Sequence, residues 1–170
     1  MSNVMCFEKI RNKYHRGILS FLTQDSTLKR EDREDLAQEV LIKIYRNMDS
    51  FDREKSPGPW VYTICRRTLT DFKRKKENQI ALCEFQEEAH FILSPSGPQE
   101  QLEKKEDLEK LHRILRHLPS PSRQILFLVY WEGMTCRETG RIMGIPAGTV
   151  KYKLFAMRKT IRSLWNEEEK

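Results

Sequence analysis

Apolar residues recur along most of this chain with the period of an α-helix. From Met1 to about Leu22 and from Arg30 to about Met48 they fall three or four positions apart, so each segment carries one apolar stripe. The same period returns after Trp60 and in the segments that follow Leu108. The alternating pattern of a β-strand does not persist anywhere in the sequence. The pattern therefore predicts an all-α fold.

The stripes also predict which side chains point inward. In the first helix these are Phe7, Ile10, Tyr14, Ile18, Phe21 and Leu22. In the second they are Leu36, Ala37, Val40, Leu41, Ile44 and Met48, and in the third Val61, Ile64, Cys65, Thr68, Leu69 and Phe72. Between the second and third helices stands Ser56-Pro57-Gly58-Pro59, which we expect to be a loop that delivers Trp60, because prolines and glycine break a helix interior.

A change of composition divides the chain. The stretch from Asn78 to Gln101 has no long apolar period and contains Pro95-Ser96-Gly97-Pro98. From Glu84 to Glu109 eight acids stand against two lysines, which predicts a flexible acidic linker. A short helix around Cys83–Phe91 is compatible with its pattern. We therefore expect two small helical domains, over residues 1–78 and 106–170, joined by a linker over residues 79–105.

The segment from Gly133 to Trp165 predicts a helix-turn-helix. Thr135 and Glu138 form a T-x-x-E capping box, so a helix should start at Cys136 and stop at Gly144. Pro146 suits the first position of a second helix, where its missing N–H costs nothing. One narrow apolar stripe marks the buried side of that helix, formed by Val150, Leu154, Met157, Ile161 and Leu164.

Two helices combine basic residues with an aromatic. Between Gly148 and Trp165 there are five basic residues and no acid, and Phe155 lies roughly opposite Val150. An exposed aromatic there could contact a thymine methyl in the major groove. Between Trp60 and Lys76 six basic residues stand against Asp71, a composition that suits unstacked bases. A solvated face on ordinary packed helices is the alternative for both, and Trp60 alone is more often a core residue.

The composition of the whole chain fits a nucleic-acid partner. It has 170 residues, a net charge of +6 and a pI of about 9.2, which favour an anionic partner where the basic residues cluster. No run of 18 apolar residues and no signal-peptide core is present, so we expect a cytoplasmic protein. The four cysteines are widely spaced and the histidines show no ligand pattern, so no metal, cofactor or catalytic set is predicted.

These residues resemble a bacterial sigma factor of the extracytoplasmic-function type over nearly the full length. DLAQEVLIKIYR (Asp35–Arg46) resembles the helix that binds core polymerase, and WVYTICRRTLTDFKRKK (Trp60–Lys76) resembles the helix that recognises and melts the −10 element. The segment from Leu118 to Arg162, with GIPAGTVK before a basic helix, resembles the domain that reads the −35 element.

The resemblance implies binding sites and partners. The polymerase would be bound by Asp35, Gln38 and Glu39. The −35 major groove would be held and read by Thr149, Lys151, Tyr152, Lys153, Phe155 and Arg158. The −10 DNA would be held by Arg66, Arg67, Lys73, Arg74 and Lys75, with Trp60 shaping the site. The implied partners are core RNA polymerase, promoter DNA and an anti-sigma factor, with no enzymatic activity, small-molecule substrate or membrane insertion.

The sequence departs from the family pattern in places. Arg67 stands where Asn is frequent, Gly140 where Ala is usual, and Pro-Gly-Pro where an aromatic is usual before Trp60. Tyr152 replaces a small polar residue and Ala156 a basic one; these changes bear on which promoter is read. Two alternatives stay open: a helix-turn-helix regulator that is not a polymerase subunit, and an anti-sigma or RNA-binding helical adaptor.

Overall fold

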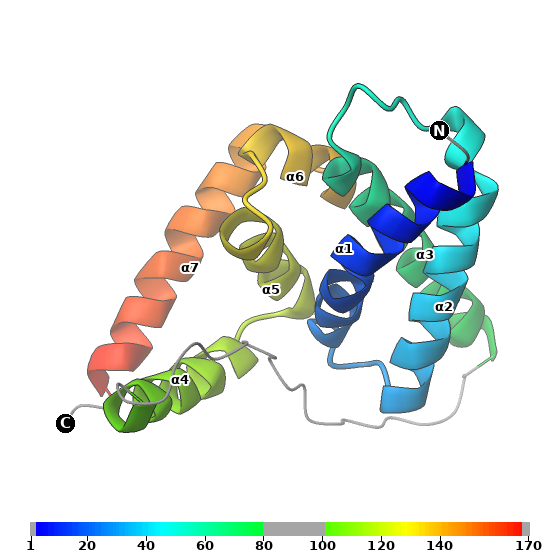
Figure 1. Ribbon diagram of the computed structural model, residues 1–170. Coiled ribbons are helices and arrows are strands. Elements are labelled where there is room, and N and C mark those ends of the chain that lie inside the picture. Colours follow the sequence, from blue (N-terminus) through cyan, green and yellow to red (C-terminus); the bar gives the residue numbers. More distant parts are fainter. Residues whose placement is uncertain (1–2, 80–100, 168–170) are drawn as a thin grey trace.

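The computed structural model describes residues 3–79 and 101–167, and within them the chain is helical without a β-strand (Figure 1). The first part contains α1 (Asn3–Thr23), α2 (Arg30–Arg46), the 3₁₀ turn η1 (Met48–Ser50) and α3 (Pro57–Gln79). The second part contains α4 (Gln101–Arg116), α5 (Ser120–Leu126), the π-helical turn η2 (Phe127–Trp131), α6 (Cys136–Met143) and α7 (Ala147–Glu167). The all-α, two-domain fold is confirmed.

Helices α1, α2 and α3 enclose the larger apolar core. All the side chains predicted to point inward on these helices are buried or half-buried. Tyr62 is also fully buried, which the apolar stripe of α3 did not predict. Its ring lies in edge or tilted contact with Tyr14 and Phe21 of α1, at centroid distances of 6.1 and 5.7 Å. Contact with these aromatic side chains of α1 therefore buries Tyr62 in addition to the apolar stripe of α3.

The prediction of a loop before Trp60 is wrong. Helix α3 begins at Pro57, so Pro57 and Pro59 lie in its first turn, where backbone N–H groups have no intrahelical acceptor. The carbonyl oxygen of Pro59 already accepts a hydrogen bond from the Thr63 hydroxyl at 2.7 Å. Gly58 is packed closely, since a Cβ there would lie 3.3 Å from the Tyr14 hydroxyl oxygen. The tetrapeptide starts the helix instead of preceding it.

A smaller core joins α4, α5 and α7. Its buried members are Leu115, Leu118, Ile125, Leu126, Val150, Leu154 and Met157. The stripe predicted on α7 is confirmed, because its first three members are buried and its last two are half-buried. Burial of this stripe leaves the opposite side of α7 in solvent.

The helix-turn-helix forms largely as predicted. The Glu138 N–H donates to the Thr135 hydroxyl at 3.2 Å, and the Thr135 N–H donates to the Glu138 carboxylate at 2.9 Å. Gly144 has φ +70° and ends α6 in the left-handed region. Pro146 lies one residue earlier than predicted, since its carbonyl accepts the first bond of α7, from Val150 N–H at 3.1 Å.

The two parts of the chain pack against each other. Phe127, Leu128, Met134 and Ile142 of the second part belong to the same core as α1, α2 and α3. Helices α3 and α6 lie against one another, whereas α2 and α7 lie on opposite sides of the molecule (Figure 1). The domain boundaries stay predictions, and the expected helix at 83–91 lies outside the described residues. None of the described helices has the length and apolarity needed to cross a bilayer.

Candidate interfaces for nucleic acid and polymerase

Four of the six residues predicted to read −35 DNA are exposed on α7. Tyr152 and Phe155 are 71% and 67% exposed, which is unusual for large aromatic side chains. Lys151 and Arg158 are exposed, and Thr149 and Lys153 are half-buried. The narrow apolar stripe explains this exposure, because only the side of α7 that carries the stripe packs against the rest of the protein. The first turns of α7 therefore present aromatic and basic side chains to solvent.

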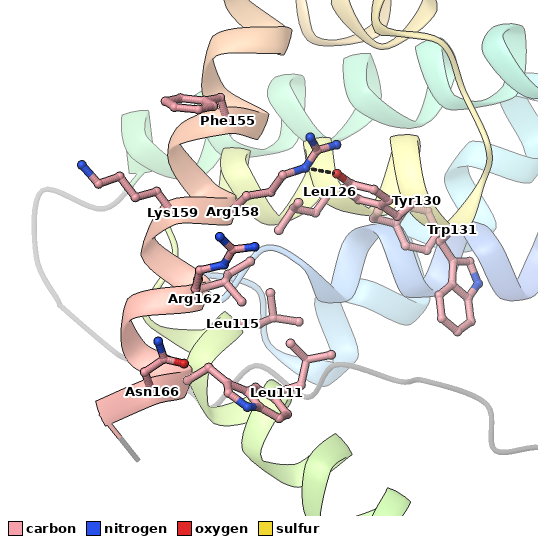
Figure 2. A pocket seen from close by; sticks show the side chains of 13 residues that line it. Leu111, Leu115, Leu126, Tyr130, Trp131, Phe155, Arg158, Lys159, Arg162 and Asn166 are labelled. Atoms are coloured by element: carbon pink, nitrogen blue, oxygen red, sulfur yellow. Dashed lines mark hydrogen bonds between the residues drawn. The ribbon is translucent and has the colours of Figure 1, made fainter. Parts of the chain in front are cut away.

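Arg158 is held by a neighbouring element. Its Nε donates a hydrogen bond to the Tyr130 hydroxyl at 2.6 Å, and its guanidinium carbon lies 5.5 Å from the centre of the Tyr130 ring (Figure 2). Tyr130 belongs to the π-helical turn η2, in which the Glu132 N–H bonds to the Phe127 carbonyl at 3.1 Å. The contact turns the Arg158 side chain toward η2.

An apolar groove lies between α4, η2 and α7 (Figure 2). Its volume is about 970 Å³, and apolar side chains line it, among them Leu111, Leu115, Leu126, Ile161 and Trp165. Basic side chains stand along α7 beside it: Arg158, Lys159 and Arg162. Trp131 and Tyr130 are about half-exposed there. An open apolar groove of this size is a candidate docking surface. In the sequence, the groove could have been suspected from the adjacent aromatic residues Tyr130 and Trp131, which do not belong to the apolar stripe that precedes them.

The basic residues predicted on α3 do not form one free face. Arg67, Arg74 and Lys75 are exposed, and Arg74 pairs with Asp71 at 3.3 Å. Arg66 and Lys73, which the resemblance also assigns to −10 DNA, are less available than the other three. Their side chains are half-buried in contacts with other elements, because polar groups of the chain outside α3 reach them.

Lys73 and Arg66 have different partners. The Lys73 ammonium lies 2.9 Å from the Asp25 carboxylate, which is 3% exposed. Burial raises the pKa of Asp25, but hydrogen bonds from Thr27 and Lys73 and the charge of Lys73 outweigh it, so the pKa lies below its ordinary value. The Arg66 Nη1 donates to the Gln124 side-chain oxygen at 3.3 Å, and burial lowers the Arg66 pKa. Arg66 therefore contacts the second part of the chain.

Trp60 lies in a cleft between the two parts. Its ring packs on Phe51 with centroids 4.8 Å apart. The cleft, of about 470 Å³, is also lined by Thr63 of α3 and by Glu138 and Arg141 of α6. Trp60 is half-buried, so it is partly core and partly cleft wall.

The candidate polymerase-binding residues form an acidic face on α2. Asp35, Gln38 and Glu39 are all exposed, and Glu39 pairs with Lys43 at 2.8 Å. Ile42 is 51% exposed on the same face, since it follows Gln38 by four positions and Glu39 by three. The sequence analysis did not include Ile42 among the candidate binding residues, although its position outside the apolar stripe of α2 indicates that it is exposed. An apolar residue within an acidic face suits a protein partner better than DNA.

Within the described ranges, no three His, Cys, Asp or Glu side chains gather to hold a metal ion. The cysteines described there, Cys6, Cys65 and Cys136, are free thiols. Burial raises the pKa of the Cys65 thiol, which makes that group unreactive.

Two family models match the chain. The model of sigma-70 region 2 matches residues 10–79, and the model of sigma-70 region 4 matches residues 108–161. The chain is 28% identical over 160 residues to the ECF RNA polymerase sigma factor SigM of Bacillus subtilis, covering 94% of this chain and 93% of SigM. It is 29% identical over 144 residues to the ECF sigma factor SigW of Bacillus subtilis, covering 78% and 77%.

Two solved structures share the fold. One is the sigma factor RpoE in complex with the anti-sigma factor NepR from Bartonella quintana, with a TM-score of 0.75, 21% identity, and coverage of 94% of this chain and 96% of that chain. The other is CnrH in complex with the cytosolic domain of CnrY, with a TM-score of 0.64, 16% identity, and coverage of 98% and 91%.

Proposed function

The chain belongs to the sigma-70 family, as a sigma factor of the extracytoplasmic-function type, and on this premise we propose how its surfaces divide the work of promoter recognition. It is a polymerase-associated sigma factor, not a regulator that acts outside the polymerase. Core RNA polymerase and promoter DNA are its partners. It acts by binding, without catalytic chemistry of its own, in the cytoplasm where the polymerase works.

The acidic face of α2 binds core polymerase. Asp35, Gln38 and Glu39 lie together in solvent, and Ile42 adds an apolar contact among them. Charged groups around an apolar centre form the usual rim and core of a protein interface. This division of roles predicts that charge reversal weakens assembly, whereas loss of Ile42 shortens the lifetime of the complex.

The exposed side of α7 reads the −35 element. Thr149, Lys151, Tyr152 and Lys153 lie in its first two turns, as expected of a recognition helix whose N-terminal residues meet base edges. Basic groups there attract phosphates, and Phe155 offers an apolar contact to a thymine methyl. Arg158, one turn further on and tied to Tyr130, suits a phosphate at the edge of the groove.

Helix α3 engages the −10 element. Arg67, Arg74 and Lys75 are exposed and available to phosphates, while Arg66 and Lys73 need to leave their present partners first. Trp60, with its cleft, is placed to pack against an unstacked base. Extracting a base costs a few kcal/mol, which stacking and basic contacts on the displaced strand can offset without ATP.

A separate anti-sigma factor controls the protein. Of the two solved structures described above, RpoE is in complex with the anti-sigma factor NepR. CnrH is in complex with the cytosolic domain of CnrY. The apolar groove of the second domain, with its basic edge on α7, suits an amphipathic acidic helix, and the α2 face is a second surface that an inhibitor could cover. The inhibitor then competes with core polymerase.

The observation that carries the proposal is the pair of basic, aromatic-bearing helices α3 and α7 within the two matched sigma regions. The test is transcription by core polymerase with and without the protein. Promoter-specific transcripts that need the protein are expected. Transcription that does not change with its addition would contradict the proposal.

A further inference from the structure

A buried arginine ties the second domain to the first. Arg123 of α5 is 4% exposed, and its Nε and Nη2 donate to the carbonyl oxygen of Gln24 at 3.1 and 2.7 Å. Its Nη1 donates to the Leu118 carbonyl at 2.6 Å. Gln24 directly follows α1, so its carbonyl lies at the negative end of the helix dipole. The charge of Arg123 is thus held by oriented carbonyl groups of both domains.

Apolar and hydroxyl contacts also join the two domains. The ring of Phe127 lies 6.2 Å from that of Phe21 and 5.9 Å from that of Tyr62, and all three are buried. The hydroxyl oxygens of Ser26 and Ser120 lie 3.3 Å apart. The interface therefore has an interior like that of a folded domain, with the polar contacts of Arg123 beside it.

This docking occupies part of the surface proposed for −10 DNA. The Arg66 guanidinium bonds to Gln124 of α5, and α6 supplies Glu138 and Arg141 to the cleft that holds Trp60. Helices α2 and α7 lie on opposite sides of the molecule (Figure 1), and most of their candidate binding residues are exposed. The closed arrangement thus covers one of the three proposed binding surfaces and leaves two open.

The interface also contains groups that gain from opening. The Gln124 side-chain nitrogen is buried and makes no hydrogen bond to another described group. Burial raises the pKa of the Glu132 carboxyl, despite the neighbouring Tyr62 hydroxyl and Lys13 ammonium. Both groups are better solvated when the domains separate, so their burial offsets part of the free energy gained by docking.

We propose that this docking is an autoinhibitory contact, latched by Arg123, which opens before α3 engages −10 DNA. The inference rests on the proposed assignment of −10 DNA to α3. The closed protein binds core polymerase through α2 and −35 DNA through α7, but it does not open a promoter. Partners that bind the separated domains more tightly than the docked ones shift the equilibrium toward the open form.

The decisive experiment locks the interface with a disulfide. The hydroxyl oxygens of Ser26 and Ser120 lie 3.3 Å apart, so sulfur atoms in their place in the variant Ser26→Cys with Ser120→Cys would lie close together. Peptide mapping identifies the intended crosslink, and the single variant Ser26→Cys, oxidised in the same way, controls for the native thiols. The crosslinked protein should retain binding to core polymerase and to −35 duplex. It should lose promoter opening and regain it on reduction. Promoter opening by the crosslinked form at the rate of the reduced form would overturn the latch.

A second variant tests the latch in the other direction. Arg123→Met keeps side-chain length but loses the charge and all donors, and Arg116→Met, at an exposed site on α4, is the matched control. The radius of gyration in solution scattering should rise for Arg123→Met only, and promoter opening should become faster. An unchanged radius with unchanged opening would contradict the proposal, and circular dichroism shows whether the variant folds. The proposed function fails separately, if the reduced protein directs no promoter-specific transcript with core polymerase.

Discussion

Arg158 on the recognition helix donates a hydrogen bond to the Tyr130 hydroxyl at 2.6 Å and lies over the face of the same ring. This contact joins α7 to the π-helical turn η2, 28 residues earlier in the sequence. It restricts a long side chain that would otherwise sample many rotamers, so the proposed contact of the guanidinium with a DNA phosphate would cost less conformational entropy.

Tyr130→Phe should therefore weaken −35 binding through Arg158. The variant keeps the ring but removes the hydroxyl acceptor, so we expect a loss of up to about 1 kcal/mol in binding free energy. The measurement is a double-mutant cycle with Arg158→Ala on −35 duplex. The effect of Tyr130→Phe should vanish when Arg158 is absent. Additive losses would mean that Tyr130 does not act through Arg158.

Lys151→Ala should weaken binding to every duplex alike. Lys151 is exposed on the first turns of α7, where a phosphate contact is expected. Loss of one such contact lowers the slope of log affinity against log salt by about 0.9. Affinity is measured at several salt concentrations on promoter and non-promoter duplexes. An unchanged slope would show that Lys151 is a solvated lysine.

Asp35→Arg with Glu39→Arg should prevent assembly with core polymerase without unfolding the protein. Both residues are exposed and lie off the buried stripe of α2. Pull-down with core enzyme measures assembly, and circular dichroism measures folding. Glu8→Arg with Glu54→Arg makes the same charge change at exposed sites outside α2 and should bind normally. A folded α2 variant that binds core enzyme fully would remove this face from the polymerase interface.

Gly140→Ala should destabilise the helix-turn-helix. A Cβ at Gly140 would lie 2.6 Å from the carbonyl oxygen of Ile145, a backbone atom that cannot move without shifting the turn. Overpacking of this kind costs about 1–3 kcal/mol. Gly148→Ala is the control, because a Cβ there meets nothing within 4 Å. Chemical denaturation should show a loss for the first variant only, and equal stability of both would contradict the close approach.

The ionised Asp25 carboxylate should stabilise the folded protein, and this contribution should be lost as the pH is lowered into the acid range. Its pKa in the folded protein lies below the ordinary value of 3.8, because hydrogen bonds from Thr27 and Lys73 outweigh the effect of burial. The unfolded chain therefore binds the proton more tightly, so the contribution of Asp25 is full above the unfolded pKa and is lost as pH falls through the folded pKa. Unfolding measured against pH should show a shallower acid-side decline for Asp25→Asn. The same decline in both proteins would assign it to other carboxylates.

The amino-acid sequence determined the parts of this protein that depend on near neighbours. The stripes on α1, α2, α3 and α7, the Thr135–Glu138 capping box and the stop at Gly144 are local patterns, so periodicity and cap chemistry were enough to find them. The exposed sides followed from the stripes, and the resemblance to a known family assigned candidate residues to those sides of α2 and α7. Local patterns did not give the start of α3, because prolines that interrupt a helix interior are also well suited to its first turn.

Only the tertiary structure decided how the two domains meet. Arg123 and Gln24 are 99 residues apart, and Arg66 and Gln124 are 58 apart, so no helical period relates them. The local sequence around Arg123 does not show that this arginine is buried and bonded to carbonyl oxygens. The local sequence of α3 likewise does not show that Arg66 bonds to a residue of another helix. The burial of Tyr62 by aromatics of α1 and η2 has the same origin. Local sequence fixes which side of a helix is apolar, whereas the packing of distant elements decides which polar groups on the other sides remain available to partners.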